Sequence, residues 1–279
     1  MFVSTYAHAS DFLDKAQTYL EQQEVVNGLM LGITYRLQQS VPQTAPYLAL
    51  VEEGGNFALA AVMTPPHKLV LYSHLDEPDD AVQALIAQLR QSDWTIPAVI
   101  GPASVADAFA SLWGQPSRPG MFQRVYELRE VIHPVYPAGS FRTATLDDLD
   151  VIAQWVQNFY IDIGAKATLD AAREDAMQSI TKQTIVVWEN QQLVSMAAKS
   201  RPTRHGIAVN FVYTPPAERR KGYATACVAR LSQQLLDDGY EYCTLFTDLA
   251  NPTSNDIYQQ IGYVLVCDFN EYHFDTPRR

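Results

Sequence analysis

The sequence predicts an α/β protein built of two consecutive domains, each a mixed, largely antiparallel sheet flanked by helices. Two observations predict this architecture. The order of strand-like and helix-like segments in the first 132 residues is repeated after residue 140, and the segment between them, residues 133–139, contains two prolines and a glycine. We therefore expect domains at residues 1–132 and 140–279, joined by a linker at 133–139.

In the first half, the spacing of apolar residues predicts a helix from Ser10 to about Leu37. The pair Gly54-Gly55 predicts a hairpin turn between two apolar runs. After the helix we expect strands at 46–52, 57–63 and 68–74, a helix at 76–90, a strand at 96–100, a helix at 104–113 and a strand at 125–132.

The second half begins with a short strand and two helices and continues with a three-stranded meander, in which Asn190-Gln191 forms the first turn. The expected elements are a strand at 141–145, helices at 146–160 and 170–181, strands at 184–188, 193–200 and 207–213, a helix at 222–237, a strand at 242–247, a helix at 254–261 and a strand at 263–274.

Charge and composition exclude several classes of protein. The chain has 279 residues with 31 acidic and 20 basic side chains, a net charge of −11 that disfavours a nucleic-acid partner. No apolar stretch approaches the roughly 20 residues of a membrane span, so we expect a cytoplasmic protein with no membrane contact. The three cysteines, Cys227, Cys243 and Cys267, lie in apolar stretches. Their odd number and wide spacing predict buried thiols rather than disulfides or a metal site.

One basic turn has the chemistry of an anion site. A strand ending at Tyr213 is followed by two prolines, by Arg219-Arg220-Lys221, and by Gly222 at the start of an amphipathic helix. A helix N-terminus presents unpaired N–H groups and a partial positive charge, which suit phosphate. The alternative is an ordinary strand-to-helix turn with solvated charges.

This segment resembles the acetyl-CoA signature of the GNAT superfamily of N-acetyltransferases, [RQ]-x-x-G-x-[GA], which Arg219, Gly222 and Ala224 satisfy. A second part of the resemblance is the segment Asn251 to Tyr258, followed by Ile261-Gly262-Tyr263. The resemblance extends over residues 141–274.

The resemblance implies that acetyl-CoA lies in a gap between splayed central strands of the C-terminal domain. Backbone groups of Val212, Tyr213 and Thr214 would bind the pantetheine, and Asn251 would bind it from the other side. The implied pyrophosphate cradle consists of Arg219, Arg220, Lys221, Gly222, Tyr223, Ala224 and Thr225. Tyr258 would be catalytic, as the acid that protonates the leaving thiolate. No metal is expected.

The general base is not visible. The strand at 207–213 has no carboxylate, and Asn210 cannot accept a proton at neutral pH. An ordered water or one of the carboxylates of Asp162, Asp248 and Glu271 remains a candidate, although surface or capping roles suit those carboxylates better. The aromatic residues at 155, 159 and 160 are expected to belong to the core rather than to a substrate cage.

The corresponding turn of the first half, His74 to Ala81, contains four acids and no glycine. Carboxylates at a helix N-terminus would repel a pyrophosphate. We therefore expect a degenerate GNAT-like domain that has lost the cofactor site.

The sequence thus predicts an acyltransferase that moves an acetyl group from acetyl-CoA to a primary amine by direct attack on the thioester. The alternative is a non-catalytic acyl-CoA-binding or regulatory protein. The sequence leaves the acceptor amine undetermined and leaves a homodimer open.

Overall fold

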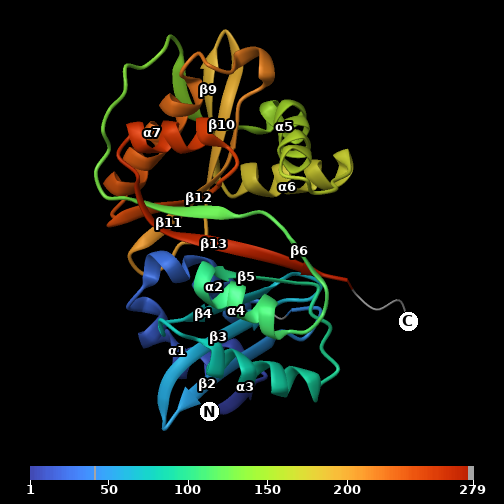
Figure 1. Cartoon of the computed structure of the whole chain (residues 1–279). Helices are drawn as coiled ribbons and strands as arrows, with labels where there is room; N and C mark the ends of the chain where they lie inside the picture. The colour runs from blue at the N-terminus through green and yellow to red at the C-terminus, as the bar shows by residue number, and fades with distance from the viewer. Residues whose placement is uncertain (41, 276–279) are drawn as a thin grey trace. The chain divides into compact units, whose positions relative to one another are not determined.

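The computed structural model describes residues 1–40 and 42–275, and the chain divides into two compact units (Figure 1). The first unit contains Met1–Val125, Phe246–Asn251 and the chain from Leu265 onward. The second contains Tyr126–Leu245 and Pro252–Val264. Each unit is described here by itself.

The first unit is a sheet covered by helices on both faces. Its strand order is β1-β2-β3-β4-β5-β13, and of the registered pairs only β4–β5 is parallel. Helices α1 and α2 pack on one face and α3 and α4 on the other. The elements are β1 (Phe2–Tyr6), α1 (Ala9–Glu21), α2 (Glu24–Gln39), β2 (Tyr47–Glu53), β3 (Asn56–Met63), β4 (Leu69–Ser73), α3 (Asp79–Arg90), β5 (Ala98–Pro102), α4 (Ala103–Leu112), β6 (Ser117–Pro119), which pairs with β13, and β13 (Val264–Phe274).

The second unit has the same plan, with strand order β7-β12-β11-β10-β9-β8. The pairs β8–β9, β9–β10 and β10–β11 are antiparallel, and β11–β12 is parallel. Helix α7 covers one face and α5 and α6 the other (Figure 1). The elements are β7 (Gln123–Leu128), β8 (Ser140–Thr143), α5 (Leu149–Asp162), α6 (Leu169–Thr181), β9 (Ile185–Asn190), β10 (Gln192–Ser200), β11 (Gly206–Tyr213), α7 (Tyr223–Asp237), β12 (Tyr242–Asp248) and α8 (Pro252–Gln260).

These sheets confirm the predicted fold class: two sets of strands, mixed in direction and largely antiparallel, flanked by helices. Within the described residues, no helix is both long enough and apolar enough to cross a bilayer. Cys227 and Cys243 are buried in the core around α7, as expected, and burial raises the pKa of the Cys243 thiol to about 12. Cys267 is half-buried.

The first predicted helix is wrong in one respect, because it is two helices. Helix α1 ends at Glu21 and α2 begins at Glu24, since Gln23 leaves the helical region at φ −127° and ψ 53°. The side-chain amide of Asn27 donates to the Leu20 carbonyl at 3.0 Å, and the Gln23 N–H donates to the same carbonyl at 3.2 Å, so the end of α1 is held by bonds from beyond it. The preceding strand β1 was not predicted either, because its five residues alternate only weakly in burial.

The last strand differs from the expected domain boundaries. Within the first unit, β13 runs antiparallel to β5, from Phe269 opposite Pro102 to His273 opposite Ala98. Its Glu271 is buried and pairs with Lys68 at 2.5 Å and His273 at 2.6 Å. Residues 265–275 are therefore grouped with the first compact unit, whereas the expected domain at 140–279 stays a prediction. Pairing between strands so distant in the chain leaves no local pattern.

Removing a side chain of β13 from the first core tests this assignment. Phe269 is 2% exposed and packs among residues of α1, α2, β2, β3 and β4. We expect Phe269→Ala to lower the free energy of unfolding by about 3–5 kcal/mol, because it leaves a cavity. The measurement is urea unfolding followed by circular dichroism. The control Phe2→Ala, at a side chain 69% exposed, should change it by less than about 0.5 kcal/mol. Equal effects of the two variants would contradict the packing of β13.

Candidate functional site

A β-bulge in β11 begins the candidate site. Along β10 and β11, Ala198 lies opposite Asn210, but Met196 lies opposite Tyr213, so β11 has one residue more than β10 between these pairs. Phe211 takes up the extra residue with φ +48°, in the left-handed region that non-glycine residues seldom occupy. A bulge leaves its extra residue without a ladder partner and bends the strand. Backbone groups at Phe211 and Val212 are thereby made available to a ligand.

Beside the bulge, β11 is paired with β12 only at its start. The registered pairs run from Gly206 opposite Tyr242 to Ala208 opposite Thr244, whereas β11 continues to Tyr213. Gly206 is required at the first pair, because a Cβ there would lie 2.0 Å from the Tyr242 ring. The strand leaves its parallel neighbour before the bulge, as the predicted splayed strands require.

The turn after β11 ends in an uncapped helix N-terminus. Gly222 occupies the N-cap position of α7 with φ +82°, and no side chain caps it. A Cβ at Gly222 would meet no atom within 4 Å, so the space beside this glycine is open. The first hydrogen bond of the helix is from the Ala226 N–H to the Gly222 carbonyl at 3.0 Å. The N–H groups of Tyr223, Ala224 and Thr225 precede it and belong to the first turn, where a helix has no internal partners for them.

Arg219 is held within the protein. Its Nε donates to the Thr214 carbonyl at 3.0 Å, its Nη2 donates to Asp162 Oδ2 at 3.0 Å, and the guanidinium lies 5.9 Å from the centre of the Tyr213 ring. The side chain thus joins the end of β11 to the end of α5. Both charged side chains are about half exposed, so this ion pair stabilises the fold by at most about 1 kcal/mol.

The other two basic residues of the turn differ from Arg219. Lys221 donates to Glu218 at 3.0 Å, three residues earlier. Arg220 is exposed and has φ +65°. Among the described residues it has no carboxylate partner, so its charge is available to an anion.

Side chains of the strand residues face the core rather than a ligand. Tyr213 is buried, and its hydroxyl accepts a hydrogen bond from Asn158 at 3.3 Å. Thr214 Oγ1 lies 2.9 Å from Ser195 Oγ, and Val212 packs against the core around α7. Their predicted role in binding pantetheine through the backbone stays a prediction.

Tyr223 also has a structural side chain. It is buried, and its hydroxyl accepts a hydrogen bond from the Asn190 amide at 2.9 Å. Ala224 and Thr225 are half-buried. These three residues therefore offer an anion their N–H groups at the start of α7.

Tyr258 lies on α8 in the same hydrophobic core as Tyr223 and Val212. It is 8% exposed and packs edge-on against Tyr263, with ring centres 6.0 Å apart. Burial raises the pKa of the Tyr258 hydroxyl to about 12. Among the described residues this hydroxyl has no hydrogen-bond partner, so its proton can be donated to a ligand.

Asn251 lies in the turn that precedes α8 and is exposed. Its N–H donates to the Asp248 carbonyl at 3.1 Å. It is grouped with the first compact unit, and its predicted role toward pantetheine stays a prediction.

The three candidate bases all hold partners already. Asp162 pairs with Arg219, Asp248 Oδ1 accepts the Ala250 N–H at 2.8 Å, and Glu271 pairs with Lys68 and His273. None is identified as a base by these contacts. From the sequence alone, Asn210 is assessed only as a base, which it cannot be. The structure adds that its Oδ1 is a buried acceptor next to the bulge with no hydrogen-bond partner among the described residues.

Trp155 is buried in the core under α5 and α6, as predicted. Phe159 and Tyr160 are only partly buried at the edge of that core. Both rings contact Phe211, the residue of the bulge. The helical spacing of these residues was visible in the sequence, but their contact with Phe211 was not, because the bulge that turns Phe211 toward them has no sequence signature.

The first unit lacks these features at the equivalent place. Its parallel strands β4 and β5 stay close, since a Cβ on Gly101 would lie 2.6 Å from the Leu71 carbonyl oxygen. Helix α3 begins with Asp79 and Asp80 after Pro78. An anion at this helix N-terminus would meet like charge.

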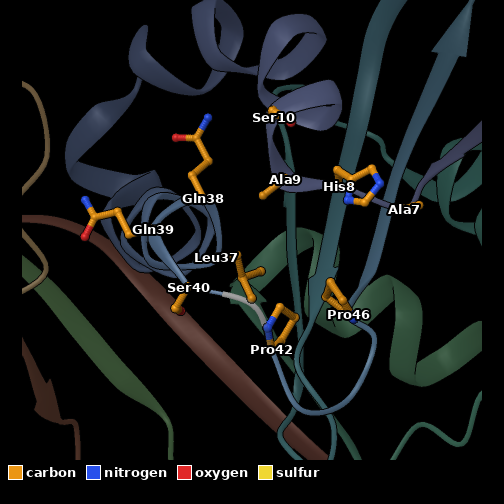
Figure 2. Close-up of a pocket in the computed structure, with 10 residues that line it drawn as sticks. All are labelled: Ala7, His8, Ala9, Ser10, Leu37, Gln38, Gln39, Ser40, Pro42 and Pro46. Atoms are coloured by element: carbon orange, nitrogen blue, oxygen red, sulfur yellow. The ribbon is translucent and has the colours of Figure 1, made fainter.

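A hollow of about 470 Å³ lies elsewhere in the first unit, between the start of α1 and the end of α2 (Figure 2). Of the ten described residues that line it, only His8 has an ionisable side chain, and Figure 2 shows Gln38 and Gln39 extending away from Pro42 and Pro46. The lining residues are Ala7, His8, Ala9, Ser10, Leu37, Gln38, Gln39, Ser40, Pro42 and Pro46. Apart from His8, its polar lining side chains are the uncharged ones of Ser10, Gln38, Gln39 and Ser40.

Comparison with known proteins identifies the second half. Residues 149–263 match the family model described as "Acetyltransferase (GNAT) family". The matched segment contains the bulge, the Gly222 turn and Tyr258. A search of curated protein sequences gave no match.

Solved structures share the fold of the whole chain. A GNAT-family acetyltransferase from Colwellia psychrerythraea aligns over 99% of this chain and 100% of its own, at 10% identity and a TM-score of 0.62. A GCN5-related N-acetyltransferase from Sphaerobacter thermophilus covers 97% and 94%, at 13% identity and 0.68. A tandem GNAT protein from the clavulanic acid biosynthesis pathway covers 100% and 99%, at 12% identity and 0.60. The chain therefore has a tandem GNAT fold, and the family implies acyl transfer from acyl-CoA.

Proposed function

We propose that this protein transfers an acetyl group from acetyl-CoA to a primary amine, with the reaction in its second unit. The observation that carries the proposal is the occurrence of two features in one segment: a bulge at Phe211 in β11 and, eleven residues later, an uncapped helix start at Gly222. The backbone at the bulge suits the thioester carbonyl, and the helix start suits the pyrophosphate of CoA. The experiment is steady-state release of CoA from acetyl-CoA with a panel of primary amines.

The phosphate end of the site fits CoA in both charge and space. Three N–H groups at the start of α7 point along the positive end of the helix dipole, which is favourable for an anion. The open space at Gly222 admits close approach of an anion to the backbone. Arg220 adds a free positive charge, and Arg219 can exchange its exposed pair with Asp162 for a phosphate at little cost.

The bulge supplies the groups needed for acyl transfer. In the reaction the amine nitrogen bonds to the acetyl carbon, the carbon–sulfur bond breaks, and the nitrogen loses one proton while the sulfur gains one. Negative charge develops on the carbonyl oxygen as the amine attacks. A backbone N–H at Phe211 or Val212, freed from the ladder by the bulge, stabilises that charge without reorganising.

Two side chains can assist the two proton transfers, one to the departing sulfur and one from the attacking amine. Tyr258 stays protonated at neutral pH, because its pKa is about 12, and can donate to the departing sulfur. The amine proton has no carboxylate on β11 to accept it. We propose that an ordered water held by Asn210 Oδ1 carries it to solvent.

The missing carboxylate also supports a second candidate, an acyl-CoA-binding protein without transferase activity. The same experiment separates the two. Bound acetyl-CoA without CoA release on any amine would establish the second candidate.

The contrast between the two units predicts one acetyl-CoA per chain. The first unit has acidic residues at α3 and closely packed β4 and β5, whereas the second has the open Gly222 turn. Isothermal titration calorimetry on the full chain should give a stoichiometry of one. A stoichiometry of two would show that the first unit retains a site.

Gly222→Glu should weaken acetyl-CoA binding at least 100-fold, since the new side chain would fill the space beside the helix start and add like charge next to a pyrophosphate. The control is Gly239→Glu at the other end of α7. Gly239 also has a positive φ (+104°), and a Cβ there also meets nothing within 4 Å, so both variants impose similar backbone strain. Titration calorimetry gives the two affinities. Equal affinities would place the phosphates elsewhere.

Tyr258→Phe should lower kcat by about 10²-fold, the low end of general acid catalysis, and leave acetyl-CoA affinity nearly unchanged. The hydroxyl acts only when sulfur leaves, and phenylalanine keeps the ring packing. The control Tyr263→Phe removes a buried hydroxyl that bonds to Ser232 at 2.9 Å, so it should lower stability and leave kcat unchanged. Wild-type kcat in Tyr258→Phe, measured with saturating acceptor, would make Tyr258 a core aromatic only.

A further inference from the structure

Three aromatic rings meet at the bulge in β11. Phe159 and Tyr160 of α5 contact Phe211, with ring centres 5.0 and 5.7 Å apart, and contact each other at 6.2 Å. All three rings are partly exposed at the edge of the core. Each therefore presents surface that no neighbouring side chain covers.

Exposed apolar side chains also occur at the end of α5 and the start of α6. Ile161, Ile163 and Leu169 are 58%, 40% and 46% exposed. Ile161 and Ile163 lie within three residues of Tyr160 in the chain. Contiguous apolar patches on a surface mark binding sites more often than isolated apolar residues do.

The charges around the rings favour a cation. The Tyr160 hydroxyl donates to Asp175 Oδ2 at 3.0 Å, and Asp175 is exposed. Between residues 162 and 175 there are four acidic and two basic side chains. Arg173 pairs with Asp150, and Arg219 pairs with Asp162, so Lys166 is the basic residue of this segment whose charge no ion pair among the described residues offsets, against the acids Asp170, Glu174 and Asp175.

We infer that the acceptor is a primary amine attached through a short chain to an aromatic ring, with no carboxylate of its own, and that Phe159 and Tyr160 select it. The inference rests on the proposed function, which places the thioester carbonyl at the bulge. The ring of the acceptor packs edge-to-face against Phe159 and Tyr160, and its amine reaches the carbonyl beside Phe211.

The rings and one carboxylate act on the amine in opposite directions. Apolar rings disfavour the charged alkylammonium and lower its pKa, whereas the carboxylate of Asp175 favours that cation. The ring faces also attract the cation, so recognition uses the three rings together with Asp175.

The test compares four amines by the CoA-release rate of the full chain: 2-phenylethylamine, n-hexylamine, spermidine and L-phenylalanine. We expect kcat/KM for 2-phenylethylamine to exceed that for each of the others by about tenfold. Higher kcat/KM for n-hexylamine, spermidine or L-phenylalanine, with acetyl-CoA bound, would overturn this inference and leave the transferase intact. Absence of acetyl-CoA binding would overturn the proposed function, and this inference with it.

Phe159→Leu tests the selecting ring without touching the bulge backbone. It should lower kcat/KM for 2-phenylethylamine about two- to tenfold, through KM, and change that for n-hexylamine less than twofold. The matched control is Phe141→Leu on β8, a half-buried ring that packs on the α7 core instead. It should alter neither value. Acetyl-CoA affinity, measured by calorimetry, should be unchanged in both. Equal effects of Phe159→Leu on the two amines, or of the two variants on 2-phenylethylamine, would overturn the inference.

Discussion

One extra residue in β11 is the constraint on which the site depends. Up to Asn210 the strand keeps its register with β10, and after the bulge at Phe211 it resumes one residue out of step. On its other side, the registered pairs with the parallel neighbour β12 stop at Ala208, before the bulge begins. The unpaired backbone groups, the position of the Phe211 ring and the entry into the Gly222 turn all follow from that insertion.

Two units with the same order of elements differ because this insertion and this turn are confined to the second. In the first, β4 and β5 keep contact through Gly101 and Leu71, and the helix that follows starts with acids. The shared architecture is set by alternation of strands and helices, which many sequences satisfy. A site requires in addition residues that break the regular pattern at the right place. The first unit has a register shift too, between Val51 and Glu52 of β2, but the registered pairs of its parallel strands β4 and β5 show none.

The sequence predicted regular elements well and their irregularities poorly. Apolar periodicity placed α3, α4, α6 and α7 and the meander within a few residues, and the glycine at 222 marked the helix start correctly. The break between α1 and α2 was missed, since Gln22-Gln23 is compatible with helix and is opened by tertiary contacts such as Asn27 to Leu20. The bulge was missed for a related reason, because Phe211 takes a positive φ that its residue type does not favour. The pairing of β13 with β5 joins segments more than 160 residues apart in the chain, so no local sequence pattern indicates it.

The arginine that defines the signature is the basic residue least available to a ligand. Arg219 donates hydrogen bonds to the Thr214 carbonyl and to Asp162, and its guanidinium lies over the Tyr213 ring. Its first effect is structural. It connects the end of α5, where Phe159 and Tyr160 lie, to the strand that leads into the Gly222 turn. Since the Asp162 pair is exposed and weak, an arriving phosphate can take the guanidinium and release that carboxylate beside the aromatic surface. A negative charge would then appear next to the rings when the anion binds, which couples the cofactor end of the site to recognition of a cationic acceptor.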